Sequence, residues 1–185
     1  MPSLTKSSVE LEDYDIMEQI GSGKLSSVYL VNCKRGRLRN RQLALRKLLT
    51  DDQSEPSEPE ASGSSSIHLS LSHPSITSLF SCFFTPSAHF QVLELCSGGS
   101  LSDHLAGKSL SEDRLRGVLK SLLEALVYLK KQGVIHRNIK PSNVLLTSDG
   151  RVKLGDFKLA TYMPPSDLPD DCFEDGLHFV APEIL

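Results

Sequence analysis

The chain has 185 residues, of which 39% are hydrophobic and 23% charged, and its formal net charge is −3. This composition is that of a globular domain large enough to bury a core, and the small negative charge argues against nucleic acid or an anionic membrane as a partner. No apolar run approaches the ~18 residues of a membrane span, the start lacks a signal-peptide core, and four cysteines without a Cys-x-x-Cys pair favour a reducing cytosol or nucleus.

The first half of the chain alternates between β-prone runs and polar loops. Three such runs predict an antiparallel meander over residues 14–47, with a Gly-Ser-Gly turn at 21–23. Two further strands are predicted near residues 79–84 and 90–95. Between these groups, residues 50–66 are rich in Ser, Pro and acidic side chains, and they contain too little apolar surface to offset the entropy of ordering. We therefore expect 50–66 to be flexible.

The second half contains one strongly periodic segment, residues 112–132, which predicts a helix. Ser111 is a suitable N-cap, and Gly133 suits the C-terminal end. A hairpin is predicted around Asp149-Gly150. One apolar stripe of the helix is expected to face the core: Leu115, Val118, Leu119, Leu122, Leu123, Leu126 and Leu129.

Three motifs follow one another in a specific order. Residues 136–143 read His-Arg-Asn-Ile-Lys-Pro-Ser-Asn, residues 156–158 read Asp-Phe-Lys, and residues 181–185 read Ala-Pro-Glu-Ile-Leu. Together they resemble the catalytic loop, the metal-binding triplet and the end of the activation segment of a eukaryotic protein kinase of the Ser/Thr type. The sequence Leu-Glu-Leu-Cys at residues 93–96 most resembles the corresponding segment of the polo-like kinases.

The resemblance implies an α+β, two-lobed, protein-kinase-like fold. Residues 1–13 would be a tail, residues 14–95 a β-rich N-lobe, and residues 96–185 a helical C-lobe joined to it by a hinge near 96–100. The family's C-lobe continues beyond the position that matches Leu185. The C-lobe of this chain is therefore expected to be incomplete.

The resemblance also implies a site for ATP and Mg²⁺. Asn143 and Asp156 would hold the metal on the phosphates, and Lys140 would balance charge on the transferred phosphoryl group. Arg46 stands where the family has its phosphate-binding Lys. The remaining implied nucleotide contacts are Ile20, Gly21, Ser22, Gly23, Val28, Ala44, Leu93, Glu94, Cys96 and Leu145.

Several positions depart from the family pattern. Asn138 replaces the Asp that accepts the proton of the substrate hydroxyl, and an amide is no base at physiological pH. Lys158 replaces the Gly of Asp-Phe-Gly. Arg46 keeps the positive charge but has a broad, planar head, which leaves Lys24 as an alternative phosphate ligand. In the family, the phosphate-binding Lys forms an ion pair with a Glu, and the position of that Glu falls near Ser64 in this chain. The ion pair is therefore expected to be absent.

These departures predict a pseudokinase of the Ser/Thr type that acts by binding or scaffolding a protein partner, with weakened or lost binding of ATP and Mg²⁺. A weakly active Ser/Thr protein kinase that uses Arg46 or Lys24 is the alternative from the enzyme class. A truncated fragment without function or a stable fold of its own is the third possibility. Restoring Asp at position 138 separates the first two, because both retain Asn143 and Asp156.

Overall fold

The computed structural model describes residues 9–23, 26–49, 58–85 and 88–163. The chain forms two compact units, the first comprising Met1–Ser57 and Leu79–Leu95 and the second Glu58–Ser78 and Cys96–Leu185. The fold is α+β, with a β-rich first unit and the helices in the second. Within the described residues, no helix has both the length and the apolar character needed to cross a bilayer.

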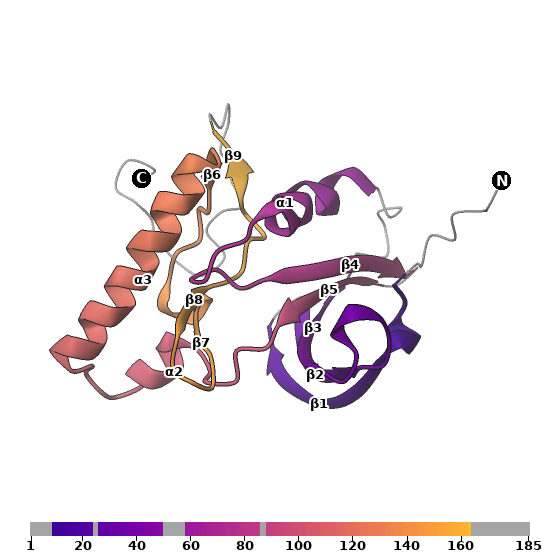
Figure 1. The fold of residues 1–185 in the computed structure, drawn as a ribbon, viewed down its shortest axis with the longest axis horizontal. Coiled ribbons are helices and arrows are strands. Elements are labelled where there is room, and N and C mark those ends of the chain that lie inside the picture. Colours follow the sequence, from indigo (N-terminus) through magenta and orange to yellow (C-terminus); the bar gives the residue numbers. More distant parts are fainter. Residues whose placement is uncertain (1–8, 24–25, 50–57, 86–87, 164–185) are drawn as a thin grey trace. The chain divides into compact units, whose positions relative to one another are not determined.

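The first unit is built on an antiparallel five-stranded sheet with the strand order β1-β2-β3-β5-β4 (Figure 1). Its strands occur where the alternation of the sequence predicted them. Short 3₁₀ turns at Leu11–Asp13 and Gly36–Leu38 lie before β1 and between β2 and β3. The strands are β1 (Tyr14–Ser22), β2 (Ser26–Cys33), β3 (Gln42–Leu49), β4 (Leu79–Thr85) and β5 (Ala88–Glu94).

One face of this sheet holds the core of the first unit. Neighbouring side chains along a strand point to opposite faces, so alternate residues of β3 and β5 enter this core. Leu45 and Val92 are fully buried there, directly opposite each other in the β3–β5 register. The buried cluster consists of Tyr14, Val31, Cys33, Leu43, Leu45, Ala88, Phe90 and Val92.

The second unit combines helices with two small sheets (Figure 1). The predicted hairpin is formed by β7 and β8, whose turn contains Gly150 with a φ of 80°. The second small sheet pairs β6 with β9. The elements are α1 (Glu58–Ser70), α2 (Leu101–Leu105), α3 (Glu112–Lys131), β6 (Val134–Ile135), a 3₁₀ turn (Pro141–Asn143), β7 (Val144–Leu146), β8 (Val152–Leu154) and β9 (Thr161–Tyr162).

Helix α1 differs from what the sequence predicted for residues 50–66. Residues 50–57 lie outside the described structure, but from Glu58 onward the chain is helical. The helix is anchored at its C-terminal half, where Ile67 and the following Leu71 are buried in one cluster with Leu129 of α3. Tertiary packing of this kind outweighs low helix propensity. Residues 58–78 are part of the second compact unit.

Helix α3 forms where it was predicted, but only part of its apolar stripe is core. The side chain of Ser111 caps the helix by accepting a hydrogen bond from the Arg114 amide. Val118, Ala125 and Leu129 are buried, with Leu122 packed beside them. The expectation was wrong for the leucines on the neighbouring face, which are exposed because no described element covers that face: Leu115, Leu119, Leu123 and Leu126.

Gly98, in the segment that follows β5, is required by a close approach of two backbone segments. The Gly98 amide donates to the Leu146 carbonyl at 2.8 Å, and the Leu146 amide donates to the Gly99 carbonyl at 2.9 Å. A Cβ at position 98 would lie 2.8 Å from the carbonyl oxygens of Leu146 and Thr147. Only glycine fits there, so this segment is held firmly against β7.

Candidate active site

The catalytic-loop motif follows β6 and is organised around the buried imidazole of His136. His136 is 2% exposed, and its Nε2 donates to the Gly155 carbonyl at 2.9 Å. Its Nδ1 accepts a hydrogen bond from the backbone N–H of Asn138 at 3.2 Å. Burial lowers the pKa of His136, although the bond to Gly155 and the nearby Asp156 carboxylate act in the opposite direction. The ring is therefore neutral and joins the loop to the metal-binding triplet.

Asn138, Asn143 and Asp156 lie close together in the second unit. The Asn138 side-chain Nδ2 donates to Asp156 Oδ2 at 3.4 Å. Asn143 Nδ2 donates to the Asn138 carbonyl at 2.8 Å, and the Gly155 amide donates to the Asn143 carbonyl at 2.8 Å. The residue at the catalytic-base position thus presents a hydrogen-bond donor to the carboxylate beside it.

Two residues of this cluster have unusual backbone conformations. Arg137 has a φ of 64° and Asp156 a φ of 59°, both in the left-handed region that costs a non-glycine residue roughly 1–2 kcal/mol. Arg137 is held by its Nε, which donates to the Leu159 carbonyl at 2.6 Å. Such conformations persist only where surrounding contacts impose them, and they are concentrated at functional sites.

Asn143 and Asp156 have the chemistry needed to bind a hard cation. The Asn143 Nδ2 is engaged with Asn138, which orients the amide and leaves its Oδ1 as the coordinating oxygen. Mg²⁺ prefers oxygen ligands and is commonly held by one or two protein groups together with phosphates. Within the described ranges, no three His, Cys, Asp or Glu side chains are grouped to hold a metal by themselves. The residues fit a cation shared with phosphate and not an all-protein metal site.

The other predicted residues of the second unit lie on the same loop, on the adjoining hairpin and in the segment that follows β5. Lys140 is partly buried and directly precedes the 3₁₀ turn at Pro141–Asn143. Leu145 lies in β7, opposite Lys153 of β8. Cys96 is partly buried in the segment that follows β5.

In the first unit, the predicted nucleotide contacts gather on the sheet face opposite the core. Paired residues of neighbouring strands share a face. Val28 pairs with Arg46, and Ala44 pairs with Leu93, so these four side chains form two adjacent rows. Glu94 is paired with Leu43 and shares the core face, which leaves its backbone as the group that could meet a nucleotide.

The glycine loop connects β1 to β2. Gly21 lies opposite Val28, Ser22 is the last residue of β1, and the Gly23 amide donates to the Ser26 carbonyl at 2.7 Å. Ile20 is exposed at the end of β1. Lys24, the alternative phosphate ligand, lies outside the described residues.

Sequence reasoning missed His68, which lies in α1 and contacts the metal-binding triplet. Its ring stacks on Phe157 with centroids 4.4 Å apart, and its Nε2 bonds to the Thr77 carbonyl at 2.7 Å. Phe157 also contacts His136 edge to face at 4.6 Å. The available signal was the spacing of Ile67 and Leu71, which is typical of a buried helix face.

Comparison with known proteins agrees with this geometry. The family described as protein kinase domain matches residues 14–185. The chain therefore belongs to the protein kinase family.

Proteins similar to this chain include sperm motility kinases and Ser/Thr-protein kinases. Sperm motility kinase 2B of Mus musculus is 34% identical over 174 residues, which cover 93% of this chain and 34% of that protein. The Ser/Thr-protein kinase cds1 of Schizosaccharomyces pombe is 34% identical over 179 residues, covering 95% and 39%. The Ser/Thr-protein kinase PLK4 of Aedes aegypti is 32% identical over 177 residues, covering 94% and 23%. The chain spans between about a quarter and two-fifths of the length of these relatives.

Proposed function

We propose that this chain is a catalytically inactive kinase domain of the Ser/Thr type that acts by binding other molecules. The observation that carries the proposal is the hydrogen bond from Asn138 Nδ2 to Asp156 Oδ2. An Asp at position 138 would accept the proton of the substrate hydroxyl, whereas the amide of Asn138 only donates in this contact. Loss of a general base of this kind lowers the rate by about 10²–10⁴-fold.

A degraded nucleotide site is part of this proposal. Asn143 and Asp156 would hold Mg²⁺, and the sheet face with Val28 and Ala44 would contact adenine. Arg46 would meet phosphate through a guanidinium in place of the compact ammonium typical of the family, which supports weak binding. Phosphoryl transfer depends mainly on positioning and charge stabilisation, so an altered phosphate ligand adds to the loss of the base.

Weak kinase activity is the second candidate, and the retained pair of Asn143 and Asp156 favours it. We would measure transfer from radiolabelled ATP to a general Ser/Thr substrate protein, using wild type, Asn138→Asp and Asp156→Ala. For an inactive domain, wild type should match the Asp156→Ala background. Transfer by wild type that disappears in Asp156→Ala would overturn the proposal.

Thermal unfolding of the same chain with Mg-ATP tests the nucleotide site separately. A saturable rise in melting temperature that requires magnesium and is absent in Asp156→Ala supports a retained site. An unchanged melting temperature supports a binding role without nucleotide. Absence of any cooperative transition would mean that the chain does not fold alone, which would refute both functions for this chain.

A further inference from the structure

The loop that joins β2 to β3 concentrates positive charge in a chain whose net charge is −3. Residues 34–41 read Lys-Arg-Gly-Arg-Leu-Arg-Asn-Arg, which places five cations within eight residues. All five are exposed: Lys34, Arg35, Arg37, Arg39 and Arg41. None of them belongs to the cluster around Asn138 and Asp156 or to the predicted nucleotide contacts, so the function proposed above does not use this loop.

The backbone of the loop is fixed by hydrogen bonds. The Cys33 amide donates to the Arg41 carbonyl at 3.0 Å, and the Asn40 amide donates to the Cys33 carbonyl at 2.7 Å. Between these bonds Gly36–Leu38 form a 3₁₀ turn, and Leu38 packs against the buried cluster of the first unit. A run of like charges is often disordered. Here the cations stand on an ordered backbone, so a ligand does not have to order it.

Acidic residues of the preceding segment neutralise the start of the loop. Lys34 Nζ lies 3.1 Å from Asp15 Oδ1, and Arg35 Nε lies 3.2 Å from Asp13 Oδ1. The Lys34 amide also donates to the Asp13 carbonyl at 2.8 Å, so the segment with the exposed Glu12 runs beside the loop. An extended polyanion, such as nucleic acid or a flat anionic membrane, would meet these acids. A compact anion can contact the loop alone.

Two arginines in the middle of the loop have no such partner. The Arg41 guanidinium lies over the Phe80 ring, 5.9 Å from its centroid. Arg37 and Arg39 are exposed, and within the described part of the chain neither side chain forms an ion pair or a hydrogen bond. Their Cα atoms lie at most about 7 Å apart, because two residues of extended chain span no more than that. Both guanidinium groups can therefore reach one small anion.

We propose that Arg37 and Arg39 bind the phosphate of a phosphorylated serine or threonine in another protein, a ligand class that rests on the binding role proposed above. A phosphate monoester carries about −1.5 to −2 charges near pH 7 and has three acceptor oxygens. A carboxylate carries one charge, and one forked guanidinium already satisfies it. A pair of guanidinium groups therefore matches phosphate better than Asp or Glu. Four of the five cations are arginine, whose planar fork suits bidentate contact with phosphate.

The test uses the ¹⁵N-labelled full chain, titrated in NMR with the peptide acetyl-Gly-Ala-phosphoserine-Ala-Gly-amide. We expect saturable shifts of the backbone signals of residues 36–41, and no shifts with the same peptide carrying unmodified Ser. A peptide with Glu in place of phosphoserine should bind at least about tenfold more weakly. Equal binding of the Glu peptide would contradict recognition of phosphate. Shifts confined to Gly21 and Gly23 would place the phosphate in the nucleotide site and overturn the proposal.

Variants of the two arginines test the contact itself. Arg37→Ala combined with Arg39→Ala should weaken phosphopeptide binding at least about tenfold and leave the melting temperature unchanged, because both side chains are exposed. Arg37→Lys combined with Arg39→Lys keeps the charge but not the fork, and it should restore only part of the affinity. Full restoration would indicate general charge attraction and refute the proposed contact.

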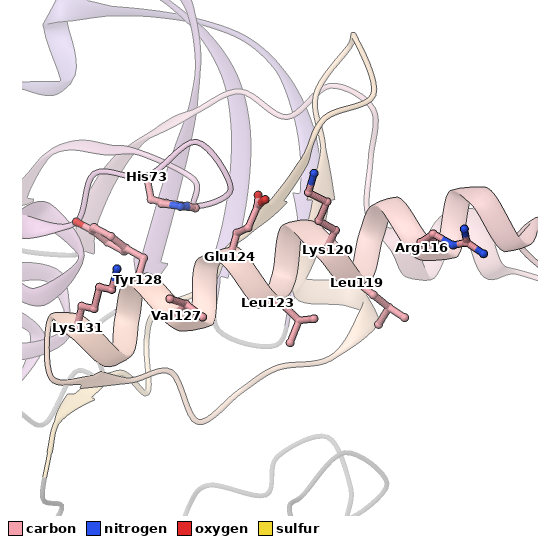
Figure 2. Close-up of a pocket in the computed structure, with 9 residues that line it drawn as sticks. All are labelled: His73, Arg116, Leu119, Lys120, Leu123, Glu124, Val127, Tyr128 and Lys131. Carbon is pink, nitrogen blue, oxygen red and sulfur yellow. The ribbon is translucent and has the colours of Figure 1, made fainter.

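A matched control removes the same charge from the second unit. Lys120→Ala combined with Lys131→Ala changes two exposed lysines of α3, both shown in Figure 2, and should leave phosphopeptide binding unchanged. If this pair weakens binding as much as the alanine variant of Arg37 and Arg39, the peptide responds to overall charge and the proposal fails.

Two other classes of ligand would also overturn the proposal. Phosphatidylserine vesicles or single-stranded DNA that bind wild type, but not the alanine variant of Arg37 and Arg39, would identify an extended polyanion as the ligand if the phosphopeptide does not bind. None of these results depends on Asn138 or Asp156. Phosphoryl transfer by wild type would overturn the proposed function and leave the loop result standing. A phosphopeptide that fails to bind the loop would refute this site and leave the inactive domain standing.

Discussion

The imidazole of His68 stacks on the ring of Phe157, with centroids 4.4 Å apart and planes inclined by 28°. This contact links helix α1 to the residue beside Asp156. Both side chains are buried, and His136 contacts the same phenyl ring from another direction. The ring of Phe157, next to Asp156, thus contacts both α1 and the loop that carries His136.

Removing the His68 ring should destabilise the second unit strongly. His68→Ala deletes the stack and leaves the Thr77 carbonyl without this partner, a loss of about 2–4 kcal/mol in the free energy of unfolding. Denaturant unfolding measures this loss. The control is His104→Ala, which removes an exposed His bonded to Gly98, and it should cost less than about 1 kcal/mol. Equal losses in the two variants would contradict a special role for the stack.

Restoring the carboxylate at position 138 should create a repulsive pair with Asp156. Asn138→Asp places two carboxylates near the 3.4 Å separation of the present contact, at a cost of about 1–4 kcal/mol in magnesium-free buffer. The repulsion raises the pKa of one carboxyl above its unfolded value, so the penalty shrinks as the pH falls from about 6 to 4. Melting curves against pH measure it. Asn138→Ala is the uncharged control, and identical pH profiles would exclude the repulsion.

Replacing Gly98 by alanine should lower the free energy of unfolding. Its Cβ would lie 2.8 Å from two backbone carbonyl oxygens, and the backbone must shift, at about 1–3 kcal/mol. Gly117→Ala is the matched control, since position 117 lies in α3 with nothing within 4 Å of an added Cβ. That variant should be more stable than wild type by roughly 0.5–1 kcal/mol. Melting temperatures that move in the same direction would refute the close approach at Gly98.

His89 should make the first unit sensitive to acid. It is 3% exposed, and its Nε2 has no hydrogen-bond partner among the residues that the structure describes. Burial, followed by the positive charge of Arg46, lowers the pKa of His89 below its ordinary value of 6.5. Below pH 6.5 the imidazole of His89 is protonated in the unfolded chain but remains neutral in the folded chain. The free energy of unfolding therefore falls as the pH falls, until the folded pKa is reached.

The variant His89→Phe removes this titration and keeps an aromatic ring that can stack on Phe84. The centroids of the His89 and Phe84 rings lie 4.3 Å apart. We expect it to gain about 1–3 kcal/mol at neutral pH, because a buried polar atom without a partner is removed, and to gain more at pH 5. Unfolding free energies at pH 7.5 and pH 5 measure both effects. A constant difference between variant and wild type across this range would rule out titration of His89.

Local patterns were sufficient for much of this protein. They predicted the five strands, the ends of α3 and the hairpin at Gly150, whereas the grouping of Asn138, Asn143 and Asp156 was implied only by the resemblance of their motifs to those of protein kinases. Alternation, capping residues and motif spacing act over a few residues, so they can be recognised without knowing the rest of the fold.

Other features depend on which distant segments of the chain pack together. Helix α1 forms in a Ser- and Pro-rich stretch because Ile67 and Leu71 join the buried cluster of the second unit, which also contains residues of α3. Only three of the seven residues of the predicted α3 stripe pack in the core. An amphipathic pattern shows that a helix face is apolar but not which element covers it. The stack of His68 on Phe157 joins residues 89 positions apart in the chain, a separation at which no local pattern acts.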